Sequence, residues 1–88
     1  MSREDRDELL TWKDRFIDRE TDKSWGFKTG DEEEYAPGKY RDVLIFLPKS
    51  QCKIEPGGAQ AGEIVDVHIP RWLVESKGLE NEVEDYEG

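Results

Sequence analysis

Residues 43–47 form the most apolar run in the chain, and they constrain the fold more than any other segment. The run reads Val-Leu-Ile-Phe-Leu, which is too short for a typical helix and rich in β-branched and aromatic residues, so it predicts a buried strand. Pro48 follows directly and cannot donate to a sheet ladder. The strand therefore ends there, or passes through an edge or a bulge before residues 49–54.

The core around this strand must be thin. Of the 88 residues, 34% are hydrophobic and 40% are charged, so a few large side chains have to supply most of the buried surface. These side chains are Trp12, Phe16, Trp25, Phe27, Phe46 and Trp72. We expect one small β-rich domain over residues 1–79 and a flexible acidic tail over residues 80–88, with a core that includes Ile45, Phe46, Val67, Trp72 and Leu79.

The C-terminal half carries the clearest boundary signals. Residues 55–62 contain one proline and three glycines and predict a turn, and residues 65–69 then alternate apolar and polar side chains, as in a strand with one solvent face. Pro70 suits the first turn of a helix, and Gly78 suits the position just after its end. The sequence therefore predicts a helix over residues 71–77, with Leu79 folding back onto it.

The N-terminal half allows two interpretations. Ser2 and Asp5 form a variant of the capping box, which predicts a short helix over residues 3–11. Leu9, Trp12, Phe16 and Glu20 would continue a helical spacing. Apolar side chains on both sides of the polar group at residues 21–24 instead predict two strands and a turn over residues 15–29, and we favour this hairpin.

Residues 29–41 show no apolar periodicity and contain several turn residues, so we expect an exposed loop. Together these elements predict an α+β, mostly β, fold. It would be a small bent antiparallel sheet or partly open barrel of about four strands, with a short N-terminal helix and a C-terminal helix.

The net charge of −9 is concentrated in two segments. Residues 31–34 contribute −4 and residues 80–88 contribute −5, so the rest of the chain is neutral. Nucleic-acid binding depends on Lys and Arg that neutralise phosphates, so direct binding to nucleic acid is disfavoured and a protein with a basic surface is the expected partner. The polar N-terminus and the lack of a long apolar segment make the cytoplasm the expected compartment.

Enzymatic chemistry is poorly supported. Ser50, His68 and Asp66 supply the residue types of a catalytic triad, but the residues around Ser50 lack the glycines of a nucleophile turn. His68 and Cys52 are the only histidine and cysteine, which excludes an internal disulfide and the multi-cysteine zinc motifs. We expect no catalytic residues, no metal and no cofactor.

The candidate partner-binding site lies in the predicted loop at residues 29–41. Recognition residues concentrate in exposed loops on rigid scaffolds, and tyrosines beside carboxylates offer both apolar contact and hydrogen bonding. The alternative is that the acidic residues have no binding role and only keep the protein soluble. The candidate residues are Asp31, Glu32, Glu33, Glu34, Tyr35 and Tyr40.

Two short motifs carry a resemblance. The segments Leu-Pro-Lys-Ser-Gln at residues 47–51 and Ile-Pro-Arg-Trp-Leu-Val-Glu-Ser-Lys-Gly-Leu at residues 69–79 resemble a group of small phage and prophage proteins of unassigned function. The resemblance covers residues 15–79, and its motifs are structural, so it implies a shared fold more than a shared activity. It leaves out the acidic residues 31–41 and 80–88.

Small acidic phage proteins include inhibitors of host defence, such as anti-CRISPR proteins and DNA mimics. The resemblance therefore implies a non-enzymatic inhibitor or modulator that occupies the basic surface of a host nucleic-acid-binding machinery. The alternative is a phage accessory small-barrel protein that binds nucleic acid or a replication enzyme.

Overall fold

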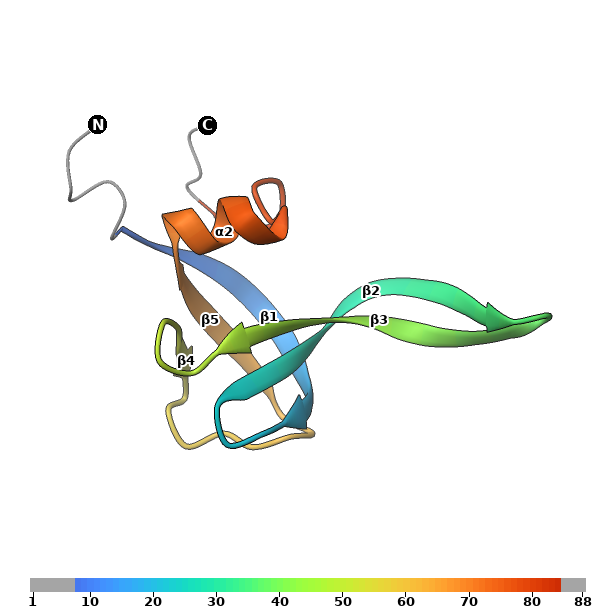
Figure 1. The fold of residues 1–88 in the computed structure, drawn as a ribbon. Coiled ribbons are helices and arrows are strands. Elements are labelled where there is room, and N and C mark those ends of the chain that lie inside the picture. Colours follow the sequence, from blue (N-terminus) through green and yellow to red (C-terminus); the bar gives the residue numbers. More distant parts are fainter. Residues whose placement is uncertain (1–7, 85–88) are drawn as a thin grey trace.

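The computed structural model describes residues 8–84, which form five strands and one short helix. In chain order these are β1 (Leu9–Glu20), β2 (Ser24–Ala36), β3 (Lys39–Pro48), β4 (Lys53–Glu55), β5 (Ile64–Pro70) and α2 (Arg71–Lys77). The strands form one open antiparallel sheet in the order β3-β2-β1-β5-β4 (Figure 1). The mostly β class is confirmed.

The first strand holds two halves of the sheet together. Residues 9–16 of β1 pair with β5, and residues 17–20 pair with β2. The pairing with β5 is interrupted between Trp12 and Arg15, where Asp14 adopts a positive φ of 55°. Bulges of this kind bend a strand and increase its twist, so β1 can serve both halves of a strongly curved sheet.

The core lies between the two halves of the sheet and under α2. Trp12 from β1 meets Phe27 from β2 edge to face, with ring centroids 6.1 Å apart. Val67 and Ile69 of β5 are completely buried, as is Val74 of α2. Buried aliphatic side chains from β1, β3, β4, β5 and α2 belong to the same core cluster, and the partly buried Trp25 and Ile45 pack against it.

The helix α2 begins and ends as the sequence predicts. Pro70 precedes it in an extended conformation, and Gly78 follows it with the left-handed φ of 71°. The Leu79 amide donates to the Val74 carbonyl at 2.9 Å, and the Leu79 side chain is buried. These contacts close the helix by the glycine-based motif common at helix ends.

Residues 80–84, which belong to the predicted acidic tail, pack against the sheet. Val83 is buried, and the Glu84 amide donates to the Thr11 carbonyl at 2.8 Å. Lys13 lies 3.6 Å from the Glu84 carboxylate. Residues 85–88 lie outside the described part of the chain.

The predicted N-terminal helix is wrong where the structure describes it. Leu9 and Thr11 belong to β1, where they pair with Pro70 and His68 of β5. The predicted helix over residues 3–11 otherwise lies mostly within residues 1–7, outside the described part. The hairpin over residues 15–29 is confirmed in type, and the sheet has five strands where we predicted about four.

Two further predictions are corrected. Residues 29–41 are not a loop, because β2 continues to Ala36 and β3 starts at Lys39. Phe46 and Trp72 were expected in the core, but they are 43% and 38% exposed. Only one face of β3 is covered, so Leu47 is fully buried while the neighbouring Phe46 points to the other face.

Candidate protein-binding surface

The β2–β3 hairpin extends beyond the body of the protein. We call residues 30–42 the arm; in Figure 1 they form the green ribbon that projects away from the other strands. The register of β2 against β3 shifts between Lys28 and Glu32, and Gly30 in this bulge has a φ of 92°. The Thr29 hydroxyl donates to the Val43 carbonyl at 3.0 Å and accepts from the Asp31 amide at 3.2 Å. The arm therefore has a well-defined base.

The tip of the arm is a tight turn at Pro37 and Gly38. Proline followed by a glycine with positive φ, here 74°, is typical of a type II turn. The Gly38 amide also donates to the Glu34 carboxylate at 3.3 Å. The turn holds Ala36 opposite Lys39 and completes the hairpin.

All six candidate residues lie on the arm, although the sequence placed them in a loop. Tyr35 and Tyr40 are 56% and 59% exposed. Because side chains alternate along a strand, the candidates divide between the two faces of the hairpin. Glu32 and Glu34 share one face, and Glu34 pairs with Tyr40; the other face carries Glu33 and Tyr35.

The arm is only partly neutralised by its own basic side chains. Arg41, which the sequence analysis did not single out, donates to the Glu33 carboxylate at 2.7 Å and lies 5.7 Å from the centre of the Tyr35 ring. Arg41 is directly opposite Glu33 only because β2 pairs with β3 in this register, so a segment predicted as a loop gave no signal for it.

Lys28 forms the second ion pair, at 3.2 Å from Asp42 at the base of the arm. Within residues 8–84, no basic side chain lies within ion-pair distance of Asp31, Glu32 or Glu34. These three carboxylates therefore give the arm its negative field.

Four apolar side chains lie on the face of the sheet opposite the core, because they alternate along their strands with the buried Ile17, Leu47 and Val65. We call them the outer patch: Phe16, Leu44, Phe46 and Ile64. Phe16 pairs with Ile64, which is 63% exposed, and the Lys28 ammonium lies 4.9 Å from the centre of the Phe16 ring. The Phe46 ring covers Gly26, where an added Cβ would lie 2.8 Å from the ring.

A cavity of about 470 Å³ opens beside the outer patch. Leu44 and Phe46 supply its apolar wall, and charged side chains of both signs form the remainder. These are Asp18, Arg19, Glu33, Arg41 and Asp42. Sequence reasoning did not select this surface as the candidate site, because it assigned Phe46 to the core.

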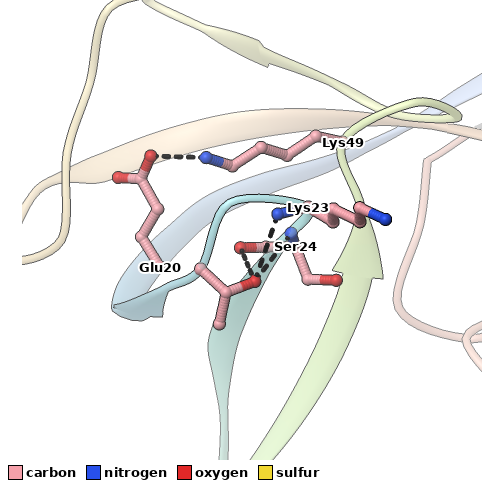
Figure 2. Close-up of polar contacts among 5 residues, drawn as sticks. Glu20, Lys23, Ser24 and Lys49 are labelled. Atoms are coloured by element: carbon pink, nitrogen blue, oxygen red, sulfur yellow. Dashed lines mark hydrogen bonds and ion pairs between the residues drawn. The ribbon is translucent and has the colours of Figure 1, made fainter.

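A separate polar cluster holds the turn between β1 and β2. The Lys49 ammonium donates to the Glu20 carboxylate (Figure 2), and the two atoms are 2.6 Å apart. The Thr21 hydroxyl donates to the Ser24 carbonyl and accepts from the Lys23 and Ser24 amides. Lys49 also lies 5.5 Å from the centre of the Trp25 ring. These contacts hold the end of the β2–β3 hairpin that is farthest from the arm.

The residues of the rejected triad make other contacts. The two ring nitrogens of His68 lie 3.2 Å from the Thr11 hydroxyl and 3.0 Å from the Glu55 carboxylate. Asp66 accepts a hydrogen bond from the Asp14 amide at 3.1 Å. Ser50 lines a different cavity, of about 420 Å³, at the turns beyond β1 and β3.

Within the described residues, no three His, Cys, Asp or Glu side chains come together as metal ligands would. The same part of the chain contains no helix with the length and apolar character needed to span a membrane.

Comparison with known proteins gives no relative. No protein-family model, curated protein or solved structure matches the chain. The residues of the arm and the outer patch are therefore the features of this chain that indicate a function.

Proposed function

We propose that this chain is a small acidic, non-enzymatic protein-binding module whose arm occupies a basic surface on its partner. The observation that carries the proposal is the set of carboxylates at Asp31, Glu32 and Glu34, which form no ion pair with any basic side chain of residues 8–84 and lie beside the exposed Tyr35 and Tyr40. Complementary charge accelerates such an association, and tyrosines supply the apolar contact that charge alone lacks.

The proposed partner is a nucleic-acid-binding complex of a host cell, and the arm would compete with nucleic acid for its basic channel. The resemblance to small phage and prophage proteins supports a module that acts in the host cytoplasm as an inhibitor or modulator, in the manner of anti-CRISPR proteins or DNA mimics. A hairpin that projects from a compact body suits this role, because it can enter a groove that the body could not (Figure 1).

Charge reversal tests the proposal. Changing Asp31, Glu32 and Glu34 to Lys should weaken binding to a captured partner at least tenfold, about 1.4 kcal/mol, because the unneutralised charges of the arm are inverted. The matched control reverses Asp22, Glu63 and Glu82, which are exposed and lie outside the arm, with the same change in net charge.

Capture from lysate followed by mass spectrometry identifies the partner, and calorimetry then compares the three proteins. Duplex DNA should release the captured partner. Equal losses in both triple variants would indicate that only net charge matters, and unchanged affinity of the folded arm variant would contradict the proposal.

A second function is favoured by one observation on the outer patch. Phe16 with Lys28 above its ring, together with Arg19 near the exposed Phe46, offers aromatic and cationic groups of the kind that bind single-stranded nucleic acid. This is the alternative of an accessory small-barrel protein. Salt-sensitive binding to single-stranded DNA that is lost in Phe46→Ala would favour it over the first proposal.

A further inference from the structure

The outer edge of β3 is an unpaired sheet edge at its centre. Hydrogen bonds in an antiparallel pair alternate, so every second residue of an edge strand directs its backbone groups away from its neighbour. The Lys49 amide donates to the Lys23 carbonyl at 2.8 Å, and the register from there to the pair Lys28 and Leu44 is unbroken. In this register the backbone amides and carbonyls of Leu47 and Ile45 form hydrogen bonds to β2. Those of Phe46 and Leu44 point to the open edge.

Neither of these residues finds another backbone partner among residues 8–84. The open edge ends at Pro48, which has no backbone N–H to donate. The Pro48 carbonyl accepts hydrogen bonds from the Gln51 and Cys52 amides, each at 3.2 Å. Natural sheets protect exposed edges with lysine, proline or bulges. Residues 42–47 of β3 contain no lysine or proline, and the bulge at the base of the arm is in β2.

Side chains beside this edge are arranged to receive a neighbour. Phe46 is 43% exposed although it is a large aromatic residue, and it forms a wall of the 470 Å³ cavity together with Leu44. Such a site resembles the recognition mode in which backbone hydrogen bonds give affinity and pockets for alternate side chains give specificity.

We propose that the partner supplies an extended segment, rich in basic and β-branched residues, that adds to the sheet as a sixth strand along β3. This inference rests on the proposed function and names how the partner is held. The segment would bond to the backbone of Leu44 and Phe46 and would place an apolar side chain against the Phe46 ring. Its basic residues would run toward the carboxylates of the arm.

Charge favours such a segment over a second copy of this chain as the occupant. Pairing two copies along β3 would combine two molecules of charge −9, and each arm, with five acidic and two basic residues over residues 31–42, would lie beside the other molecule. Like-charge repulsion opposes that assembly, and a basic segment is attracted to the same edge.

The experiment uses the full chain labelled with ¹⁵N and an acetylated, amidated peptide of sequence Arg-Val-Lys-Val-Arg-Val-Lys as probe. A second peptide of the same sequence carries N-methyl groups on alternate residues, on the edge that would pair, which removes its hydrogen-bond donors without changing its charge. The unmodified peptide should bind and should slow hydrogen exchange at the Leu44 and Phe46 amides at least tenfold. The methylated peptide should bind at least tenfold more weakly.

Two substitutions of Leu44 distinguish the contribution of its backbone hydrogen bond to peptide binding from that of its side chain. Leu44→Pro removes an amide that faces the open edge, where proline is tolerated in strands, and should weaken peptide binding at least tenfold more than Leu44→Ala. If Leu44→Pro does not fold, the methylated peptide still decides the question.

Equal binding of the two peptides, no binding by either, or protection confined to other strands would overturn the proposal. Sedimentation that reveals a dimer joined along β3 would also overturn it, by assigning the edge to a second copy. The same variants distinguish this inference from the proposed function. If a captured partner depends on Asp31, Glu32 and Glu34 but not on the β3 edge, the arm function stands and strand addition fails. If the edge binds the peptide but reversal of the arm leaves the partner's affinity unchanged, the arm function fails.

Discussion

At the scale of single residues, two tryptophans that look equivalent in the sequence make different contributions. Trp12 is 2% exposed and packs against Phe27, whereas Trp72 is 38% exposed on the helix. Trp12→Ala should lower the free energy of unfolding by about 3–5 kcal/mol, the usual cost of truncating a buried aromatic side chain. Trp72→Ala should cost only about 1–2 kcal/mol, because much of its surface is already in water.

Urea denaturation of the two variants measures both losses. Unchanged slopes of the unfolding free energy against urea would confirm that the changes reflect stability alone. A larger loss for Trp72→Ala than for Trp12→Ala would contradict the core assignment.

Cys52 couples stability to alkaline pH. Burial raises the pKa of its thiol from 9.0 to about 11, because the thiolate is disfavoured away from water. Between these values the unfolded chain loses the proton while the folded chain keeps it, so the unfolded state binds fewer protons and stability falls as pH rises. The contribution of the neutral thiol is therefore fully present below pH 9 and is lost as pH rises from 9 through 11.

The comparison with Cys52→Ala isolates this effect from the titration of tyrosines and lysines. The wild type should lose about 2 kcal/mol more stability than the variant between pH 8 and pH 11, measured by urea denaturation at each pH. Parallel pH profiles for the two proteins would contradict a buried thiol.

At the scale of elements, the arm should be dispensable for folding. Every residue of the core lies outside residues 30–42, and the last core side chain of β2 before the arm is Phe27. Replacing residues 30–42 with Asn-Gly joins Thr29 to Val43 through a two-residue turn that suits hairpins. The free energy of unfolding should change by less than about 1 kcal/mol, while partner binding should be lost.

Thermal unfolding followed by circular dichroism, together with the capture experiment, checks both parts of this prediction. A truncated protein that no longer folds would show that the arm stabilises the body.

Elements differ in how far the sequence predicts them, for physical reasons. The helix α2 was predicted to its end, because Pro70 and Gly78 impose backbone conformations that are local properties. The arm was predicted as a loop, because both of its faces are in water and no apolar alternation marks its strands. Only the Pro-Gly pair at residues 37–38, between two segments of opposite charge, indicated a hairpin.

The N-terminal error has a different cause. The capping pattern at Ser2 and Asp5 predicted a helix over residues 3–11, but residues 9–11 are held in β1 by their pairing with β5, which is distant in the sequence. The bulge at residues 13–14 then changes the alternation of β1, so Trp12 and Ile17 both reach the core from a strand. The candidate acidic residues were predicted to be exposed together, whereas Arg41 and the outer patch depend on strand pairing, which the sequence alone does not reveal.

At the scale of the whole molecule, the separation of charge from core predicts a strong salt dependence of binding. The arm carries five acidic residues and projects away from the other strands (Figure 1), and every core residue lies outside it. Because screening lengths fall from about 10 Å at 0.1 M salt to about 3 Å at 1 M, affinity for the partner should fall at least tenfold over that range. Calorimetry at several salt concentrations measures this slope. The affinity of the truncated protein should depend much less on salt concentration. Equal salt dependence of the two proteins would show that the charges that bind the partner lie outside the arm.

The pairing of β1 with β5 also has a consequence for how the chain folds as it is synthesised. Leu9 pairs with Pro70, and the Thr11 carbonyl accepts from the Glu84 amide, so β1 must wait for residues 64–84 to be synthesised before it can pair with β5. The β2–β3 hairpin needs only nearby residues and can form earlier, because contacts close in sequence form faster. Until residue 70 has emerged, Trp12 and Phe27 lack the strand that covers them. Over that interval these two core side chains are exposed in a chain that already carries the acidic arm, and the arm would then keep the incomplete fold in solution.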